Sequence, residues 1–498
     1  MKNNWKSLIA GGCLALGYAS VSTLSLVALI HSEKAYAQDN LSNTLKIEEC
    51  HIDGIKAQVK CATLEVSENY QQPTGKKISL NAVILPAMDN SENKTPLFFL
   101  AGGPGQAASE LASALNKRYS TIRNTRDIVL IDQRGTGKSN PLQCEDTVGM
   151  DVYSLAPEDF SAQEVTNCLA ELNNDLSQFN TENAIRDFEQ FRIALGYNKI
   201  NIYGGSYGTR SGLTYLRMFP ESLESAVLDS VGPIEVPIGT FGQSAARSFN
   251  LLLAHCIEDS ACNTAYPNLR SEFDAVVERL AQSPQKVTIA HPRLGTPTEF
   301  VITTSKFIAN LRMQLYSMHT RPLVPLIIHQ AFLENYMPLA GLVAQMDQGM
   351  GMYVGLTFNI VCNEDIPRVT EQMLAQDADN NFGKADSHQG WLTACNIWPK
   401  YQPSEDFTSP VTVDVPTLIL SGNLDPVTPP SNGDYSDKTL ANSRHIVSQY
   451  DAHIVASSSC ALKMIAGFLE DKSPEKVDAT CLEERPKETF MTNLNGSL

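Results

Sequence analysis

Basic residues are scarce in this sequence. Lys and Arg total 38 against 55 Asp and Glu, which gives a formal net charge of −17. A polyanionic partner would meet net repulsion, so nucleic acid and anionic membrane surfaces are disfavoured as partners. Charged residues of both signs make up only 19% of the chain, and hydrophobic residues make up 43%. These proportions are ordinary for a globular protein and disfavour wholesale disorder, a polytopic membrane protein and a coiled coil.

Several motifs are also missing. No pair of CxxC motifs occurs, so a structural zinc site has little support. The segment Gly135–Ser139 looks like the end of a phosphate-binding loop, but that pattern needs glycine where the chain has Asp132. No internal repeat or low-complexity tract is found. We therefore expect no metal and no other cofactor.

Residues 1–37 have the layout of a secretory signal peptide. Lys2 and Lys6 precede an apolar stretch from about Leu8 to Ile30, and Ala35-Tyr36-Ala37 follows with small residues at its outer positions. An uncleaved membrane anchor is the alternative, but glycine, serine and threonine residues dilute the stretch. We predict cleavage after Ala37 and export, either to the periplasm or out of the cell, with no membrane partner afterwards.

The cysteines fit this prediction of export. Cleavage removes Cys13 and leaves ten of the 11 cysteines. An even number in an oxidising compartment suggests disulfides, and sequential pairing is the simplest of the connectivities that the sequence allows. The ten are Cys50, Cys61, Cys144, Cys168, Cys256, Cys262, Cys362, Cys395, Cys460 and Cys481.

Short apolar runs predict a mostly parallel sheet. Residues 54–88 alternate apolar and polar around a Pro-Thr-Gly turn, which is typical of antiparallel strands. Continuous apolar runs that end at turns suit buried parallel strands. Such runs lie at residues 96–100, 128–131, 200–203, 226–228, 417–420 and 444–447. Helical segments between them, such as 181–195 and 207–219, indicate repeated βα units.

A mostly helical stretch separates the two groups of parallel strands. It runs from about residue 237 to 401 and contains helical patterns at 243–256, 269–280 and 304–318, with strand signal only near 287–290 and 300–303. We predict one α/β domain, formed by residues 38–235 and 406–498, that is interrupted by a helical cap at residues 236–405.

A G-x-S-x-G pattern lies where a predicted strand meets a predicted helix. Residues 200–208 read Ile-Asn-Ile-Tyr-Gly-Gly-Ser-Tyr-Gly. Such a sharp turn needs glycine on both sides of Ser206, because side chains there would collide. The N-terminus of the next helix then favours negative charge that develops at Ser206. The alternative is a glycine-rich turn with an incidental serine. We predict that Ser206 is a nucleophile.

A serine nucleophile needs a base that removes its proton and an acid that orients the base. Asp425 follows the strand at 417–420, and His453 lies just past the last strand, where active-site groups collect. His445 is the only other histidine beyond Asp425 and is expected within a strand. Asp451 is the alternative acid, but so near His453 it is expected to be solvated. We predict Asp425 as the acid and His453 as the base.

A tetrahedral intermediate needs N–H donors aimed at its oxygen. Gly102 and Gly103 lie in a glycine-rich loop after the first buried strand, where backbone N–H groups can approach Ser206. A tight turn without a function is the alternative. We predict an oxyanion hole formed by this loop and by the N–H of Tyr207.

Four groups of residues together carry a resemblance to a known family. They are Gly102–Gly105, Asp132–Ser139, Gly204–Gly208, and the late pair Asp425 and His453. The sequence resembles the proline iminopeptidase and tripeptidyl aminopeptidase group of α/β-hydrolases, above all its exported members with a large cap. The resemblance covers most of residues 45–485, and the segment from His453 to Cys481 is similar to the TAP-like C-terminal domain of secreted tripeptidyl aminopeptidases. One departure is Ala101, where the family commonly has histidine.

The resemblance implies an α/β-hydrolase core, no cofactor, and exopeptidase action on a peptide or small-molecule substrate through an acyl-enzyme on Ser206. An aminopeptidase must bind a free α-amine, which a carboxylate in the cap would do most simply. Glu364 and Asp365 are the candidates, because their segment resembles the cap of similar exported proteins. A solvated acidic loop is the alternative reading of these two residues.

Two other functions use the same features. An esterase or amidase on small substrates would need the same triad, since the fold does not decide the substrate. A binding protein with an inactive hydrolase core is the non-enzymatic alternative. The sequence leaves the oligomeric state and the number of residues released per cut open.

Overall fold

The computed structural model describes residues 44–89, 91–92, 94–143, 161–290, 295–346, 351–378, 382 and 388–495. The predicted signal peptide, residues 1–37, and Cys144 lie outside these ranges. Within them, no helix has both the length and the apolar character that a membrane crossing requires.

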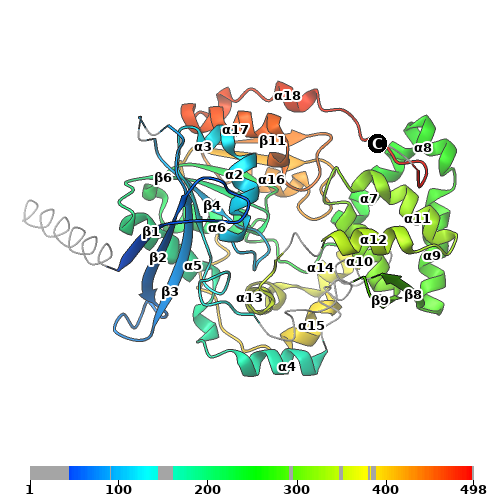
Figure 1. Cartoon of the computed structure of the whole chain (residues 1–498), viewed down its shortest axis with the longest axis horizontal. Helices are drawn as coiled ribbons and strands as arrows, with labels where there is room; N and C mark the ends of the chain where they lie inside the picture. The colour runs from blue at the N-terminus through cyan, green and yellow to red at the C-terminus, as the bar shows by residue number, and fades with distance from the viewer. Residues whose placement is uncertain are drawn as a thin grey trace, which may run out of the picture.

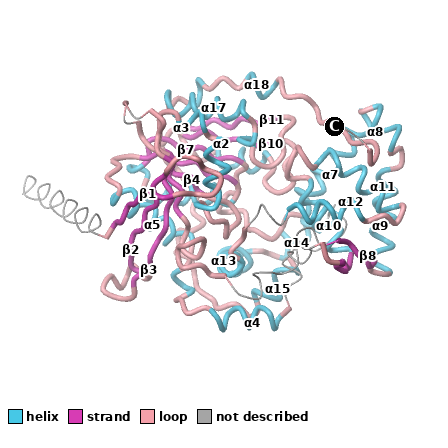
Figure 2. The backbone as a smooth tube through the Cα atoms, in the orientation of Figure 1, coloured by secondary structure: helices cyan, strands magenta, loops and turns pink. Residues whose placement is uncertain are grey.

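In the part of the chain that the structure describes, a nine-stranded sheet lies at the left of Figures 1 and 2, with the strand order β1-β2-β3-β5-β4-β6-β7-β10-β11. β1, β2 and β3 are antiparallel neighbours, and β3 is antiparallel to β5. The pairs from β5 onward are parallel. The predicted mostly parallel sheet is therefore confirmed. The strands are β1 (Leu45–Cys50), β2 (Val59–Ser67), β3 (Lys77–Leu85), β4 (Leu97–Leu100), β5 (Ile128–Ile131), β6 (Ile200–Gly205), β7 (Leu223–Asp229), β10 (Thr417–Gly422) and β11 (Ser443–Ser448).

The apolar pattern does not predict β1. This strand lies at the edge of the sheet, and most of its side chains are exposed. Because no face of β1 is buried, its sequence has no sustained apolar alternation or apolar run that would predict a strand.

Helices cover both faces of the parallel part of the sheet. Phe98 of β4 packs on the face covered by α5 (Thr181–Ala194) and α6 (Tyr207–Met218). Leu97 and Phe99 pack on the opposite face, which α2 (Ala112–Arg118), α3 (Ser120–Arg123) and α17 (Ser459–Asp471) cover. Each central strand is thus buried on both sides, which explains the continuous apolar runs in the sequence.

Between β7 and β10 the chain forms a mostly helical cap around an apolar cluster that includes Phe249, Phe273 and Phe307. In Figure 1 the helices from α7 to α12 lie at the right, away from the sheet, and α13 and α15 lie below it. The cap helices within the described residues are α7 (Gly242–Glu258), α8 (Ser260–Ala265), α9 (Leu269–Gln282), α10 (Thr304–Gln314), α11 (Val324–Phe332), α12 (Met337–Met346), α13 (Val354–Ile360), α14 (Glu371–Ala378) and α15 (Gln389–Cys395), and β8 (Gln285–Ala290) pairs antiparallel with β9 (Pro297–Ile302).

Two segments within the residue ranges predicted for the core pack on the cap instead. Val165 of α4 (Ala162–Glu171) shares an apolar cluster with Trp391 of the cap. The C-terminal tail crosses from the core to the cap (Figure 1), where the N–H of Met491 donates to the carbonyl of Pro322 at 3.2 Å. The tail has no helical or strand pattern there, so its sequence does not reveal which part it covers.

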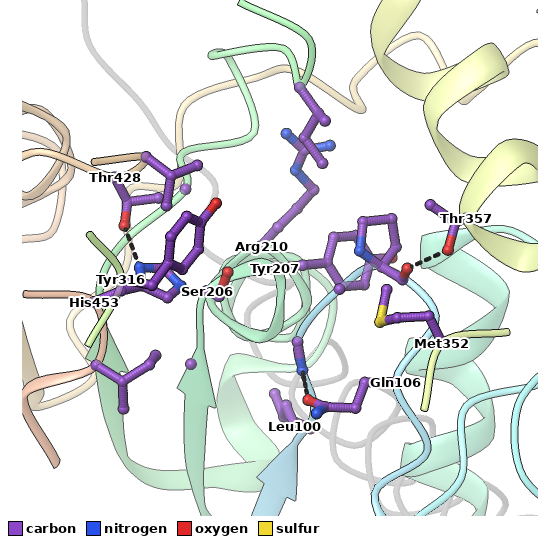
Figure 3. A pocket seen from close by; sticks show the side chains of 18 of the residues that line it. Leu100, Gln106, Ser206, Tyr207, Arg210, Tyr316, Met352, Thr357, Thr428 and His453 are labelled. Carbon is purple, nitrogen blue, oxygen red and sulfur yellow. Dashed lines mark hydrogen bonds between the residues drawn. The ribbon is translucent and has the colours of Figure 1, made fainter. Parts of the chain in front are cut away.

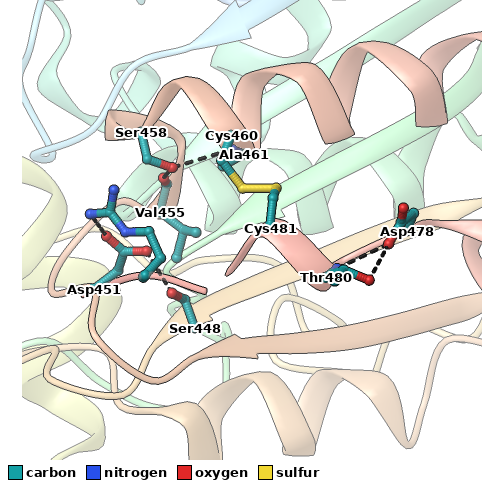
Figure 4. Close-up of a disulfide and its surroundings, with 10 residues drawn as sticks. Ser448, Asp451, Val455, Ser458, Cys460, Ala461, Asp478, Thr480 and Cys481 are labelled. Carbon is teal, nitrogen blue, oxygen red and sulfur yellow. Dashed lines mark hydrogen bonds and ion pairs between the residues drawn. A yellow bond between two sulfur atoms is a disulfide. The ribbon is translucent and has the colours of Figure 1, made fainter. Parts of the chain in front are cut away.

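Four disulfides join neighbouring cysteines in the described ranges, and they match the sequential pairing. They are Cys50–Cys61, Cys256–Cys262, Cys362–Cys395 and Cys460–Cys481. Cys168 is disulfide-bonded as well. Figure 4 shows the Cys460–Cys481 bond, which joins α17 to α18 (Thr480–Glu483) before the tail crosses to the cap. The other core helix near the C-terminus is α16 (Pro430–Asp437).

The attachment of the tail to the cap can be tested through Glu488. Its carboxylate pairs at 2.9 Å with the guanidinium of Arg321, and the two side chains are 1% and 0% exposed. Glu488→Ala leaves a buried cation without its partner, so we expect a loss of about 3–5 kcal/mol in the free energy of unfolding, measured by urea denaturation.

The neighbouring Lys487 provides a matched control. It pairs with Glu258 on the surface, where both side chains are more than half exposed, so Lys487→Ala is expected to leave the urea midpoint unchanged. Equal effects of the two substitutions would show that the tail does not pack as described.

Candidate active site

Ser206 lies in a strained turn between β6 and α6. Its backbone has φ 57° and ψ −125°, a conformation that is costly for any residue other than glycine. Two glycines make the turn possible. A Cβ on Gly204 would lie 2.2 Å from the carbonyl oxygen of Gly208, and a Cβ on Gly208 would lie 2.1 Å from that of Leu100. The turn predicted from G-x-S-x-G is therefore present, with Ser206 at its apex.

Asp425 and His453 meet at the ends of β10 and β11. Nδ1 of His453 lies 2.8 Å from Oδ2 of Asp425. Because an ionised carboxylate only accepts hydrogen bonds, Nδ1–H donates and Nε2 is left free of the proton. Asp425 is fully buried and also accepts the N–H groups of Val427 and Thr428, each at 2.9 Å. Burial would raise the pKa of Asp425, but His453 and these donors lower it below its usual value.

The cap contributes to the position of His453. The N–H of His453 donates to the carbonyl of Tyr316, which follows α10, at 3.0 Å. The two rings also pack edge to face, with centroids 5.0 Å apart. Figure 3 shows Ser206 with His453 and Tyr316 on one side and Tyr207 on the other. Neither Tyr316 nor its contact with the histidine can be found from the sequence, since it depends on how the cap folds over the core.

Ser206 and His453 line one cavity of about 690 Å³ between the core and the cap. Its walls are largely aromatic and aliphatic. The core contributes Phe99, Leu115 and Tyr119, and the cap contributes Phe241, Met313 and Phe358. The described residues that line it include the cations Arg118 and Arg210 and no carboxylate. Such a cavity suits an apolar group next to the reacting bond.

The glycine loop predicted as an oxyanion hole lies against Ser206. A Cβ on Gly102 would be 3.5 Å from the Cβ of Ser206. The N–H of Gly102 donates a long hydrogen bond, 3.4 Å, to Oε1 of Gln106 (Figure 3). Gly103 lines the cavity as well, and Tyr207 begins α6, so its N–H has no intrahelical acceptor. Gln106 was not found from the sequence, because a glutamine four residues beyond a glycine has no distinctive pattern.

Asp132 holds the loop that follows Gly105 through hydrogen bonds. Its carboxylate accepts the N–H of Ser109 at 2.8 Å, the side-chain amide of Asn81 at 2.8 Å and the N–H of Lys138 at 3.2 Å. Burial raises the pKa of Asp132. The segment that looks like a phosphate-binding loop is thus folded around a buried carboxylate, which is no place for a phosphate.

The structure corrects the expectation that Glu364 binds a substrate amine. Glu364 does not line the cavity and is 1% exposed. Its carboxylate accepts the N–H of Thr181 at 2.8 Å and the hydroxyl of Tyr401 at 3.1 Å. The hydroxyl of Thr181 donates to it as well and lies 2.7 Å from that of Tyr207. Burial raises the pKa of Glu364 to about 7. The residue links the cap to α5 and α6.

Asp365 also has partners inside the protein. It is fully buried and pairs with Arg210 of α6 through oxygens at 2.8 and 2.9 Å. Arg368 and the N–H of Ile238 complete its contacts, at 3.2 and 2.9 Å. The backbone explains both corrections: Val361–Asp365 is a π-helical turn, which aims the two carboxylates at the core. The sequence shows the residue types but not this direction.

The two residues left outside the predicted triad have clear places. Asp451 is buried rather than solvated, with its carboxylate 2.6 Å from Arg485 and 2.5 Å from the hydroxyl of Ser448 (Figure 4). His445 lies in β11, as expected, and contacts Asp434 and Ser421 at 2.9 Å each. Neither residue lines the cavity.

Comparison with known proteins gives two family matches. Residues 95–266 match the model described as alpha/beta hydrolase fold, and residues 380–481 match the model described as TAP-like protein. The chain is similar to the serine protease Hip1 of Mycobacterium tuberculosis, with 25% identity over 462 residues that cover 83% of this chain and 86% of the relative.

Two further proteins are similar over different lengths. The tripeptidyl aminopeptidase of Streptomyces lividans is 29% identical over 201 residues, 37% of each chain. The crystal structure of the proline iminopeptidase of Mycobacterium smegmatis aligns with a TM-score of 0.36 and 14% identity, covering 82% of this chain and 98% of that one.

The buried state of Glu364 predicts a pH dependence of stability. Its pKa rises from 4.5 to about 7 on folding, so the folded protein binds this proton more tightly than the unfolded chain. The resulting stability is fully present below pH 4.5 and is lost as the pH rises through about 7. Glu364→Gln lacks this loss, so its free energy of unfolding should rise relative to the unmodified protein across that window.

Urea denaturation of both proteins at a series of pH values measures this difference. Other buried carboxyl groups are present in both proteins and cancel in the comparison. A difference that stays constant between pH 4.5 and 7 would contradict the raised pKa of Glu364.

Proposed function

Since the chain belongs to the α/β-hydrolase fold family, carries a TAP-like C-terminal segment and has serine-hydrolase relatives, we propose that it is an exported serine exopeptidase. It cleaves peptide bonds near a free N-terminus, with Ser206 as nucleophile, His453 as base and Asp425 as orienting acid. The observation that carries this proposal is the 2.8 Å contact between His453 and Asp425 at the cavity that Ser206 lines.

The first chemical step forms the acyl-enzyme. Nε2 of His453 takes the proton of the Ser206 hydroxyl as Oγ attacks the substrate carbonyl carbon. The carbonyl oxygen becomes an oxyanion, for which the N–H groups of Gly102 and Tyr207 are the candidate donors. The side chain of Gln106 accepts the Gly102 N–H in the free protein, so the oxyanion takes over this donor from a weak neutral hydrogen bond.

The second step releases the products. The imidazolium of His453 gives its proton to the leaving nitrogen as the peptide bond breaks, and the acyl group stays on Ser206. Water then attacks the acyl-enzyme with His453 again as base, and the carboxylic acid leaves as Ser206 regains its proton. Asp425 holds one ring tautomer and stabilises the imidazolium without taking its proton.

The position of the site between the core and the cap supports action at chain ends. Residues of the core and of the cap both line the cavity that contains Ser206, and the carbonyl of cap residue Tyr316 accepts a hydrogen bond from the N–H of His453. A cavity with a cap over one wall admits a terminus or a short peptide more readily than the middle of a folded chain. Its aromatic and aliphatic walls suit apolar side chains near the cleaved bond.

The apolar lining also favours a second candidate, an esterase or amidase on small substrates. Glu364 and Asp365 are committed to partners inside the protein, so recognition of a free amine has to come from other groups. An ester with an apolar acyl chain needs no such recognition. The two candidates share every catalytic step and differ only in substrate.

Export rests on the cysteines. Four disulfides in the described ranges are expected of a protein in an oxidising compartment and are rare in the cytosol. We therefore propose that the protein acts in the periplasm or outside the cell.

A panel of chromogenic substrates separates the two functions. The panel contains amino-acyl, prolyl and tripeptidyl anilides with free N-termini, the same anilides with acetylated N-termini, and p-nitrophenyl esters of short acyl chains. We expect the free anilides to be cleaved with a higher kcat/KM than their acetylated forms. Ser206→Ala should abolish turnover of every substrate.

Other outcomes are equally informative. Efficient cleavage of esters with no cleavage of anilides would replace the exopeptidase by the esterase. Equal cleavage of free and acetylated anilides would reject recognition of the N-terminus. Turnover that survives in Ser206→Ala would reject the nucleophile.

A further inference from the structure

Asp229 at the end of β7 contacts both sides of the catalytic centre. β7 lies between β6, which leads to Ser206, and β10, which leads to Asp425. The main-chain carbonyl of Asp229 accepts the N–H of Ser206 at 3.0 Å. This bond holds the strained turn of the nucleophile against the neighbouring strand.

The carboxylate of Asp229 holds the segment after His453. Its Oδ1 accepts the N–H of Val455 at 2.9 Å, and its Oδ2 accepts the N–H of Ala456 at 2.8 Å and the hydroxyl of Tyr203 at 2.8 Å. The next residue, Ser230, accepts the N–H of Ile454 at 2.8 Å. Three successive N–H groups after His453 are thus bound by two adjacent side chains.

Ile454 shows why this segment needs to be held. Its φ of 70° lies in the left-handed region, which is strained for a β-branched residue. Its side chain lies close to the nucleophile turn, since a Cβ on Gly205 would be 3.0 Å from Cδ1 of Ile454. Without acceptors for the N–H groups of residues 454–456, the segment would relax toward an unstrained conformation and carry His453 with it.

The charge of Asp229 fits this role. The side chain is fully buried, and burial raises its pKa to about 6, although the donors Ala456, Val455 and Tyr203 lower it. Above that pH the group is an anion that can only accept hydrogen bonds, which matches a set of partners that are all donors. A buried charge with this many partners is costly to remove from its place.

We propose that Asp229 is a positioning residue that fixes His453 relative to Ser206 through its carboxylate on one side and its carbonyl on the other. It touches neither the substrate nor the reacting atoms. This inference rests on the proposed function, because it concerns the geometry of the serine and its base.

The test is Asp229→Asn. This substitution keeps the size of the side chain and one acceptor oxygen, but it replaces the other oxygen by an NH₂ group, which cannot accept a hydrogen bond from the donor that faces it. We expect kcat for the best substrate of the unmodified protein to fall about 10²-fold, since a displacement of the base by about 1 Å costs this much. KM should change less than threefold, because the cavity walls are untouched. Active sites are counted by fluorophosphonate titration run to completion, so that a slower reaction of Ser206 does not lower the count and kcat refers to folded protein only.

Asp187→Asn is the matched control. Asp187 is as buried as Asp229 and accepts from Arg134 and Tyr70, each at 2.6 Å, but none of these residues lines the cavity. We expect it to lower the thermal midpoint and leave kcat per active site unchanged. Ser230→Ala removes one of the three acceptors, so it should lower kcat less than Asp229→Asn. It also tests the inference if Asp229→Asn does not fold.

The outcomes are separable. If Asp229→Asn and Ser230→Ala keep the full kcat per active site and lose only thermal stability, Asp229 has a structural role and the inference is wrong. If Asp187→Asn loses kcat as strongly as Asp229→Asn, the effect is general destabilisation and the inference is also wrong. If the unmodified protein cleaves none of the substrates, the proposed function fails first, and this inference fails with it.

Discussion

The backbone of Ser206 is the constraint on which the rest of the site depends. A non-glycine residue at φ 57° and ψ −125° persists only where its surroundings outweigh the strain. Here the glycines at 204 and 208 leave room for the turn, and the carbonyl of Asp229 binds the Ser206 N–H. The strained turn places Ser206 at the N-terminus of α6, where N–H groups and the helix dipole favour negative charge. This one turn joins β6 to α6 and brings Ser206 against the glycine loop after β4.

The cap is part of the same arrangement rather than a separate lid. Tyr316 of the cap binds the backbone of His453, and Asp365 pairs with Arg210, one turn beyond Ser206. Glu364 reaches Tyr207 through the hydroxyl of Thr181. Breaking such buried contacts leaves charges without partners, so the core and the cap are expected to keep a fixed relation. The arrangement of Ser206, Asp425 and His453 therefore depends on residues that are far from them in sequence.

Much of the fold can be predicted from the sequence, because the parallel strands are buried on both faces and leave continuous apolar runs. The turn at Ser206 and the order Ser206, Asp425, His453 follow from glycine spacing and from the loops after the last strands. Other features depend on where a side chain points and on which residues it contacts after folding. Glu364 and Asp365 carry the chemistry of an amine site, but a π-helical turn aims them at the core. Asp451 pairs with Arg485, which lies 34 residues further along the chain. Gln106 and Asp229 have no motif, since their contacts exist only after folding.

The proposed chemistry requires Ser206 to be a nucleophile that His453 activates. Treatment of the folded protein with a fluorophosphonate, followed by mass analysis of its peptides, tests it most directly. We expect one phosphonate per chain, carried by the peptide that contains Ser206, and none on Ser206→Ala. Modification at another residue, or a folded protein that takes up no phosphonate, would contradict it.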